Sequence, residues 1–411
     1  MNLLILGNGF DLDHNMPTKY SDFLYFISTC IKQKLSAKID KEILSTCEDI
    51  LKTPNDSMKF FVNVDKDINH FFKKVNIEDL LLENIWLHYF LVSYKDLLKK
   101  GNTWIDLENE IASVIDQKIS SVKSTSIKEN RISGKSKWES LKYKVCLNEF
   151  ILTPTTNQKL FFDWLYDELK KFSNILERYL FIVEAHPLDR DLDFKKALAK
   201  TESIDTVLNF NYTNTYNRLY DKTNHIDFIN GELNANIILG IQNHSPNKVQ
   251  NFCDSNIHKF FKYYQRAEID SFYNYPKNTA RNKYLKWISN QYFTYDKRYI
   301  HSDDPIGHNS IDAPPQERTN QSLEINTRLK IYIIGHSLDL TDKQILKEVL
   351  LSEHTTKVTV FYYNEDDRID KLTNLLKLLG EERFINCINN NNAKPYIYLK
   401  NIDTIKLTSP L

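Results

Sequence analysis

The sequence predicts an α/β fold with a mostly parallel, Rossmann-like sheet and a large inserted helical lobe. Three observations carry this prediction. Short apolar runs, typical of strands buried on both faces, recur along the chain. Helical patterns alternate with these runs, which favours parallel strands joined by crossovers. Several of the runs lead directly into polar turns, often with glycine, although the chain has only 9 glycines in 411 residues.

The first predicted strand is the apolar run from Leu3 to Leu6, which ends at Gly7. A helix is expected to begin shortly afterwards, near Tyr20, with Thr18 or Ser21 as its cap. From about residue 24 to residue 200 the pattern is helical. Apolar positions recur at spacings of three and four in residues 77–98, 104–119 and 161–183.

Strand character then returns in the second half of the chain. The predicted strands are 204–210, 225–229, 236–239, 329–334, 357–363 and 395–399, with helices at 257–267, 342–351 and 368–379. We therefore divide the chain into core segments and insertions. The core comprises residues 1–23, 203–245 and 329–411, and the insertions are a helical lobe at 24–202 and a polar segment at 246–328.

Composition indicates an ordinary globular protein of the cytoplasm. The N-terminus has no basic region before its apolar run, and no stretch approaches the roughly 18 apolar residues of a membrane helix. The five cysteines are scattered and form no CxxC pair, which fits a reducing compartment and argues against a zinc site. Lys+Arg and Asp+Glu are equal at 54 each, so net charge does not indicate a nucleic-acid partner.

Four predicted strands end in polar turns that should lie at one edge of the sheet. These turns are residues 7–11, 209–215, 230–232 and 335–339. Ligands of open parallel sheets bind beyond the carboxyl ends of the strands. The sequence therefore predicts one cleft lined by all four turns.

The chemistry of these turns suits a phosphate-bearing ligand. Gly7 and Gly9 lack Cβ atoms, so the backbone could approach a pyrophosphate, although a tight turn alone would also need glycine. The amides in residues 209–214 could read a carboxamide or a ribose, or could cap the next helix. Asp11 and Asp22 could bind ribose hydroxyls or serve as turn and helix-first-turn residues. Ser337 and Asp339 could cap the helix that follows them.

Histidines are the remaining candidates for acid–base chemistry. His14 and His336 lie in the predicted turns. No G-x-S-x-G elbow surrounds Ser337, and no HExxH or DxDxDG pattern occurs, so we predict neither a serine hydrolase nor a dedicated metal site.

Four segments resemble the AbiH family of bacterial abortive-infection proteins. The most specific is residues 7–23, which reads GNGFDLDHNMPTKYSDF. The others, in the same order along the chain, are 104–108 (WIDLE), 209–215 (NFNYTNT) and 333–338 (IIGHSL). The resemblance implies a defence role, with a phage-derived trigger and possible assembly into homo-oligomers.

That family in turn is similar to the sirtuin-type NAD-binding fold. The resemblance places Asn211 where sirtuins have a catalytic-site asparagine, and Gly335-His336-Ser337 where they have a glycine-serine turn. It implies binding of NAD or a related nucleotide and loss of nicotinamide to water. Gly7, Asn8 and Gly9 would hold the pyrophosphate, and Ser337 and Asp339 would contact the adenosine side.

Two positions depart from the family pattern. Asn230 stands where the family usually has histidine, and an amide cannot act as a base. The base would then be His336 or His14, or the chain would be a nucleotide sensor without catalysis; a nuclease is the third alternative. Asn15 stands where the family usually has glycine, and asparagine tolerates positive φ.

The predicted site has two sets of residues. The catalytic candidates are Asn211, His336, Asn230 and His14. The predicted nucleotide contacts are Gly7, Asn8, Gly9, Phe10, Asp11, Asp22, Asn209, Thr213, Asn214, Gly231, Gly335, Ser337 and Asp339.

Overall fold

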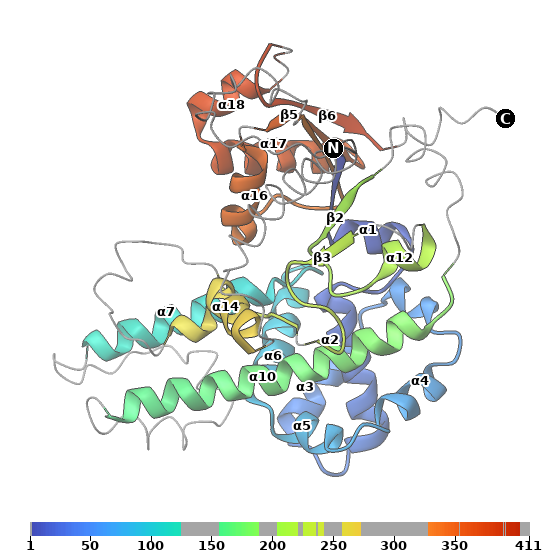
Figure 1. Cartoon of the computed structure of the whole chain (residues 1–411). Helices are drawn as coiled ribbons and strands as arrows, with labels where there is room; N and C mark the ends of the chain where they lie inside the picture. Colours follow the sequence, from blue (N-terminus) through green and yellow to red (C-terminus); the bar gives the residue numbers. More distant parts are fainter. Residues whose placement is uncertain are drawn as a thin grey trace, which may run out of the picture.

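The computed structural model places a parallel sheet above a lobe of helices (Figure 1). It describes residues 2–124, 156–188, 204–220, 225–235, 237–241, 257–272, 328–352, 354–388, 390 and 392–402. The strands are β1 (Asn2–Leu6), β2 (Thr206–Asn209), β3 (His225–Phe228), β4 (Leu329–Ile334), β5 (Thr355–Tyr362) and β6 (Tyr396–Asn401).

Helices surround the sheet and build the lobe. The α-helices are α1 (Asn8–Asp13), α2 (Tyr20–Cys30), α3 (Lys41–Leu51), α4 (Val64–Phe71), α5 (Ile77–Glu83), α6 (Ile85–Lys99), α7 (Leu107–Ser124), α10 (Thr156–Ala185), α12 (Thr215–Leu219), α14 (Lys262–Phe272), α16 (Lys343–Leu350), α17 (Glu365–Leu379) and α18 (Glu381–Cys387). A π-turn, η1 (Ile31–Leu35), and short 3₁₀ turns, η2 (Asp56–Phe60), η3 (His258–Phe260) and η5 (Leu340–Asp342), join them.

The six described strands form one sheet in the order β3-β2-β1-β4-β5-β6, and each neighbouring pair is parallel. The predicted parallel α/β fold is therefore confirmed. This order is the one that dinucleotide-binding folds use, and it reverses between β1 and β4. A crevice opens at such a reversal because the connections leave the two strands toward opposite faces.

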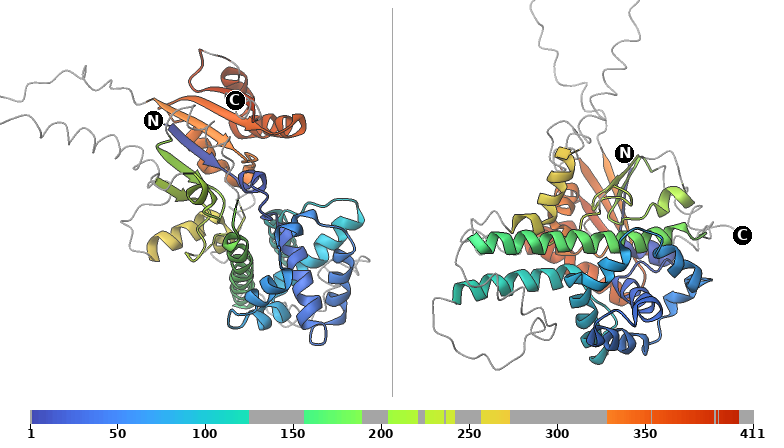
Figure 2. Two further views of the ribbon diagram at one scale, coloured as in Figure 1. Left: turned by 90° about the vertical axis from the view of Figure 1, so that its right-hand side faces the viewer. Right: turned by 90° about the horizontal axis from the view of Figure 1, so that it is seen from below.

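The central strand is apolar throughout because both its faces are covered. Leu3 and Ile5 pack into a core with α16 and α17, and Leu4 and Leu6 pack on the other face with residues of α1 and α12. Figure 2 shows helices on both sides of the twisted sheet. The strand order places the carboxyl end of β1 in the middle of the sheet edge, between β2 and β4.

The helices from α2 to α10 pack around a separate apolar core (Figure 2). The 30-residue α10 runs across this lobe, and its Tyr179 hydroxyl donates to the carbonyl of Pro17 at 2.6 Å. This bond ties the lobe to the segment that follows α1. None of the described helices combines the length and apolar character that a membrane span requires.

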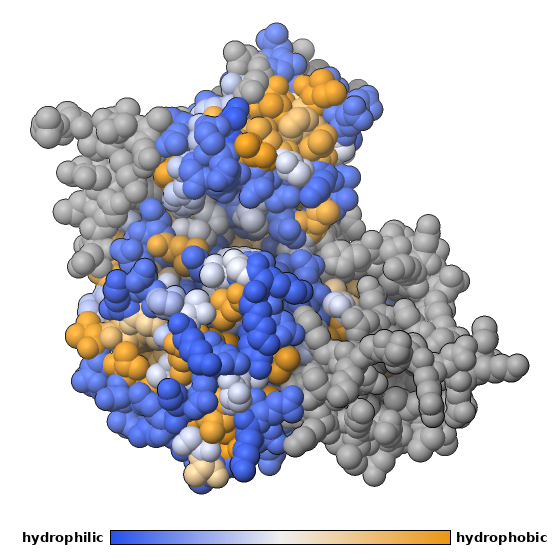
Figure 3. Space-filling model, turned by 180° about the vertical axis from the view of Figure 1, so that it is seen from behind, coloured by the Kyte–Doolittle hydropathy of each residue, from blue (hydrophilic) through white to orange (hydrophobic). Residues whose placement is uncertain are grey.

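The surface of the described residues is largely hydrophilic on the face opposite to that of Figure 1, with apolar surface gathered at its upper end (Figure 3). Three exposed apolar side chains, Ile369, Leu376 and Ile385, lie on α17 and α18. They stand apart from the cavity described below.

Several predicted boundaries were wrong for local reasons. The expected helix 77–98 is two helices, because the Asn84 side chain caps the amide of Leu87 and also donates to the carbonyl of Glu168. The expected strand 236–239 is absent among its described residues. Its carbonyls at Ile238 and Leu239 accept side-chain hydrogen bonds from Tyr212 and Gln265 instead of joining a ladder.

Helix α2 is capped differently from the prediction. Lys19 occupies the N-cap, and the Asp22 carboxylate accepts the Lys19 amide at 3.3 Å and the Asn55 side-chain amide at 3.1 Å. Thr18 bonds to Asn8 instead. The carboxylate of Asp22 is therefore taken up in starting the helix.

Candidate functional site

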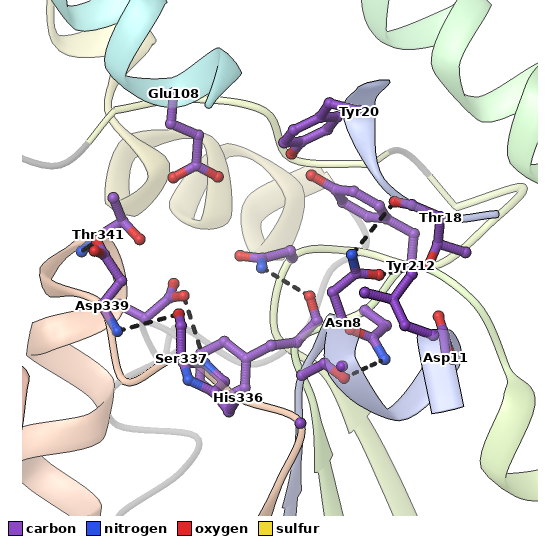
Figure 4. A pocket seen from close by; sticks show the side chains of 18 of the residues that line it. Asn8, Asp11, Thr18, Tyr20, Glu108, Tyr212, His336, Ser337, Asp339 and Thr341 are labelled. Atoms are coloured by element: carbon purple, nitrogen blue, oxygen red, sulfur yellow. Dashed lines mark hydrogen bonds and ion pairs between the residues drawn. The ribbon is translucent and has the colours of Figure 1, made fainter. Parts of the chain in front are cut away.

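A cavity of about 410 Å³ lies beyond the carboxyl ends of the central strands, where the helical lobe covers the sheet edge. Figure 4 shows Glu108 entering from α7, with Asp339, Ser337 and His336 on the turn after β4. All four predicted turns contribute to its wall. The predicted residues that line it are Gly7, Asn8, Gly9, Asp11, Asn211, Thr213, Asn230, Gly335, His336, Ser337 and Asp339.

The remaining predicted residues do not line the cavity. They are Phe10, His14, Asp22, Asn209, Asn214 and Gly231. Asn209 shapes the turn after β2, since its side chain donates to the Thr213 carbonyl and accepts the amide of Asn211. Phe10 is buried against the rings of Tyr216 and Tyr220. These contacts give both residues a place in the fold.

Three glycines allow the turns after β1 and β4 to pack against each other. A Cβ at Gly7 would lie 2.5 Å from the Cα of His336, and one at Gly9 would lie 2.8 Å from the Cα of Gly335. Gly335 has φ +67°, and a Cβ there would lie 2.1 Å from the amide nitrogen of Phe10. The close approach of the two backbones therefore requires the glycines, which agrees with the tight-turn alternative that the sequence left open beside a pyrophosphate.

His14 has both ring nitrogens engaged by its neighbours. Its Nδ1 lies 2.7 Å from the carbonyl of Phe10, which can only accept, so Nδ1 carries the proton. Its Nε2 then accepts from the hydroxyl of Tyr220. Both ring nitrogens are occupied outside the cavity, and this arrangement argues against the predicted role of His14 as a base.

His336 lines the cavity but also has both nitrogens engaged. Its Nδ1 accepts the amide of Leu338 at 2.9 Å, so the neutral ring carries its proton on Nε2, which lies 3.6 Å from Asp342 Oδ2. The ring packs edge-on against Phe210, with centroids 4.4 Å apart. A ring fixed in this way orients the turn and has no free lone pair with which to take a proton.

Asn230 is engaged on both sides of its amide. Its Oδ1 accepts from Arg266 at 2.8 Å, and its Nδ2 donates to the carbonyl of Phe210 at 3.0 Å. Arg266 also donates to the carbonyl of Ile229 at 3.0 Å. Asn230 therefore joins α14 to the turns after β2 and β3.

We expect Asn230→His to destabilise the chain without adding catalysis. Imidazole cannot replace the amide oxygen and the amide donor together, so the Arg266 contact should be left unsatisfied at a cost of about 1–3 kcal/mol. Thermal unfolding and nicotinamide release would be measured side by side, with exposed Asn69→His as the control. A gain in release would instead identify position 230 as the place of the missing base.

A buried charge cluster forms the floor between the lobe and the core. Lys262 on α14 lies 2.7 Å from Glu108 of α7 and 3.5 Å from Asp342, which is also 3.6 Å from Arg266. Burial would lower the pKa of Lys262, but Asp342 and Glu108 outweigh it and raise that pKa, so the ammonium stays charged. The cluster holds α7, α14 and the turn after β4 together.

The two carboxyls of this cluster respond differently. Burial raises the pKa of Glu108 to about 7, against the pull of Lys262. Burial would also raise the pKa of Asp342, but Lys262 and His336 outweigh it and hold this pKa below the usual range. Asp342 is therefore the permanent anion, and Glu108 is the member that can gain a proton near neutrality.

Asp11 is the second titratable group near neutrality. It is 1% exposed, its Oδ2 accepts from the Thr213 hydroxyl, and no described residue donates to its Oδ1. Burial raises the pKa of Asp11 to about 7, although the hydroxyls of Thr213 and Thr215 oppose this. A carboxyl with this pKa can take up a proton at neutral pH.

The side-chain amide of Asn211 contacts the turn after β1, which also carries Asp11. Its Nδ2 donates to the carbonyl of Gly7 at 3.1 Å, which fixes the side chain across the ends of β1 and β2. Among the described residues none donates to its Oδ1, so this oxygen can accept from a ligand or a water.

Sequence reasoning missed much of the wall. The additional lining residues are Leu12, Thr18, Tyr20, Trp104, Asp106, Glu108, Leu176, Leu180, Phe210, Tyr212, Lys262, Thr341 and Asp342. Trp104, Asp106 and Glu108 lie in the WIDLE segment, so that segment was a signal for them. Lys262 lies in the polar insertion, where no pattern in the sequence distinguished it.

Comparisons with known proteins give one match. A family model described as "Bacteriophage abortive infection AbiH" matches residues 3–364. Neither the curated proteins nor the solved structures contain a match. The likeness to sirtuins therefore stays a prediction.

Proposed function

Because the chain belongs to the AbiH family of bacteriophage abortive-infection proteins, we propose that its cavity binds NAD or a related nicotinamide nucleotide and hydrolyses the bond between nicotinamide and ribose. The family fixes the wider role in abortive infection. The ligand and the reaction are our inference from the cavity. Depletion of NAD would link the site to that role by stopping metabolism in an infected cell.

The observation that carries the proposal is that Asp11 and Asn211 both line the cavity at the carboxyl ends of β1 and β2, beside the strand-order reversal. The cavity lies at the end of β1, where this strand order binds dinucleotides. Asp11 offers a carboxyl with a pKa of about 7, and Asn211 offers an amide oxygen to which no described residue donates. The two histidines are engaged elsewhere, so they do not compete for the role of base.

The reaction needs a water molecule and a base that takes up its proton. The leaving group needs little assistance, because the pyridinium ring is already cationic. Water attacks C1′ of the ribose while the bond from C1′ to the pyridinium nitrogen breaks. The electron pair of that bond neutralises the ring, and nicotinamide leaves uncharged. The proton of the water passes to Asp11, and Asn211 Oδ1 accepts from the water or a ribose hydroxyl to hold it in place.

A direct assay tests this reaction. The purified chain would be incubated with NAD, and the nicotinamide released would be measured by chromatography. Because the family implies a phage-derived trigger, cellular NAD would also be measured in phage-infected cells. We expect release, and a loss of about 10²-fold in Asn211→Ala, the scale of one positioned polar group. Asn69→Ala, on the exposed side of α4, is the matched control.

The outcomes separate the alternatives. NAD binding without release, alone and during infection, would contradict hydrolysis and favour a nucleotide sensor. Equal release by Asn211→Ala and the control would leave hydrolysis in place and remove Asn211 from it.

A further inference from the structure

We propose that the cavity recognises the nicotinamide-ribose half of the ligand as a cationic, hydroxyl-bearing group and takes no phosphate into its interior. This inference rests on the proposed function and narrows its substrate class to N-ribosyl pyridinium compounds. Nicotinamide riboside, which has no phosphate, would then be hydrolysed to nicotinamide and ribose with one water consumed. Three features of the cavity support this.

The first feature is that three backbone donors of the turn after β1, the amides of Gly7, Gly9 and Phe10, are already used. Phosphates bind such turns through free amide N–H groups. Here the amide of Gly7 donates to Ile334 at 3.1 Å, and that of Gly9 donates to Gly335 at 2.8 Å. The amide of Phe10 donates back to the Gly7 carbonyl at 2.9 Å. The turn after β4 occupies the side from which a pyrophosphate would approach.

The side chain of Asn8 also makes hydrogen bonds within the protein. Its Oδ1 accepts from the Thr18 hydroxyl at 2.6 Å, and its Nδ2 faces the Thr18 carbonyl at 3.5 Å. Figure 4 shows the two side chains together at one side of the cavity. The contacts with Thr18 therefore hold the Asn8 side chain against the wall, with one of its two amide N–H groups directed at the Thr18 carbonyl.

The second feature is the charge of the wall. The lining carboxyls are Asp11, Asp106, Glu108, Asp339 and Asp342. Against them, Lys262 is the lining cation within the described part of the chain, and it is paired with Glu108 at 2.7 Å and Asp342 at 3.5 Å. Such a wall repels phosphate and attracts a pyridinium ring, most strongly above pH 7, where Asp11 and Glu108 are ionised.

The third feature is an acceptor on Asn211. None of the described residues donates to its Oδ1, and a ribose hydroxyl is a donor that matches this oxygen. The cavity volume of about 410 Å³ is at the lower end of the roughly 300–1,000 Å³ found for small-molecule sites, which suits half of a dinucleotide.

The experiment compares nicotinamide riboside, nicotinamide mononucleotide and NAD as substrates of the full chain. We expect kcat/KM to be at least about tenfold higher for the riboside than for either phosphate-bearing compound at low salt. The preference should shrink in added salt, because screening weakens the repulsion of phosphate.

A variant with fewer charges in the cavity wall tests the second feature, and an exposed aspartate supplies the matched control. Asp106 and Asp339 cap helical turns through Oδ1, and asparagine caps equally well, so Asp106→Asn/Asp339→Asn should keep the fold. Their loss of charge should reduce the preference for the riboside by several-fold. Exposed Asp56→Asn should leave the preference unchanged.

Binding is measured separately from turnover by the shift of the unfolding temperature. Nicotinamide riboside should raise it, and ADP-ribose, which keeps the phosphates without the cation, should not. Hydrolysis of NAD with a riboside kcat/KM lower than that of NAD would overturn this inference and leave the proposed function intact. Stabilisation by the riboside without hydrolysis of any compound would support this inference and overturn the proposed function. Stabilisation by ADP-ribose alone would also overturn the inference.

Discussion

Replacing Asp11 with asparagine should reduce nicotinamide release by about 10²- to 10⁴-fold, the usual contribution of a positioned acid or base. Asparagine keeps the shape and can still accept from the Thr213 hydroxyl, but it cannot take up a proton. In the unmodified chain, release should rise with pH through about 7, since burial raises the pKa of Asp11 to about 7 and the base must be ionised. A pH profile of kcat/KM measures this.

The same substitution should stabilise the fold above neutral pH. Because the pKa of Asp11 is raised in the folded chain, the folded state binds its proton more tightly than the unfolded state does. The stability from this carboxyl is complete below the ordinary pKa of an aspartate and is lost as pH rises toward about 7. Asp11→Asn should therefore raise Tm at about pH 8 more than at about pH 5, measured by calorimetry.

The control is Asp13→Asn, on the same helix and outside the cavity wall. It should change release by less than about twofold. Full activity of Asp11→Asn with a flat pH profile would exclude Asp11 as the base and leave Glu108, whose pKa is also raised to about 7, as the remaining carboxyl of that kind in the described wall.

The largest effect on stability is expected from Asp342→Asn, with a loss of about 3–5 kcal/mol in the free energy of unfolding. Asp342 is the anion shared by Lys262, Arg266 and His336, at 3.5, 3.6 and 3.6 Å. Removing its charge leaves two buried cations with Glu108 as the remaining partner. Denaturant unfolding at neutral pH measures the loss.

A surface pair provides the comparison. Asp56 lies 2.7 Å from Lys59, and its side chain is 89% exposed, so Asp56→Asn should cost far less stability than Asp342→Asn. If the two substitutions cost the same, the cluster around Asp342 would have to be reached by water, and its role in joining α7 to the sheet would be refuted.

Much of the fold was predictable because it follows from local patterns. The all-apolar run of residues 3–6 can only be a strand covered on both faces, and the structure places it at the centre of the sheet. The bounds predicted for β4 match the structure, since apolar residues stop sharply at Gly335. The break at Asn84 was not predicted: its side chain caps the nearby Leu87 amide, but the bond that fixes this side chain to the carbonyl of Glu168 joins a helix distant in the sequence.

In the candidate site, too, some features follow from local sequence and others from tertiary contacts. The sequence alone determined a parallel sheet, polar turns at one edge and a membership of the AbiH family. Only the tertiary structure decided which of those polar groups remain free. His336 and Asn230 read as catalytic candidates, yet Leu338 and Arg266 occupy them. Asp11 was predicted to bind ribose or to serve as a turn residue, and its burial makes it a carboxyl that can exchange a proton near neutrality. The physical reason is that residue type and spacing fix local structure, whereas hydrogen-bond partners and burial come from segments far apart in the chain.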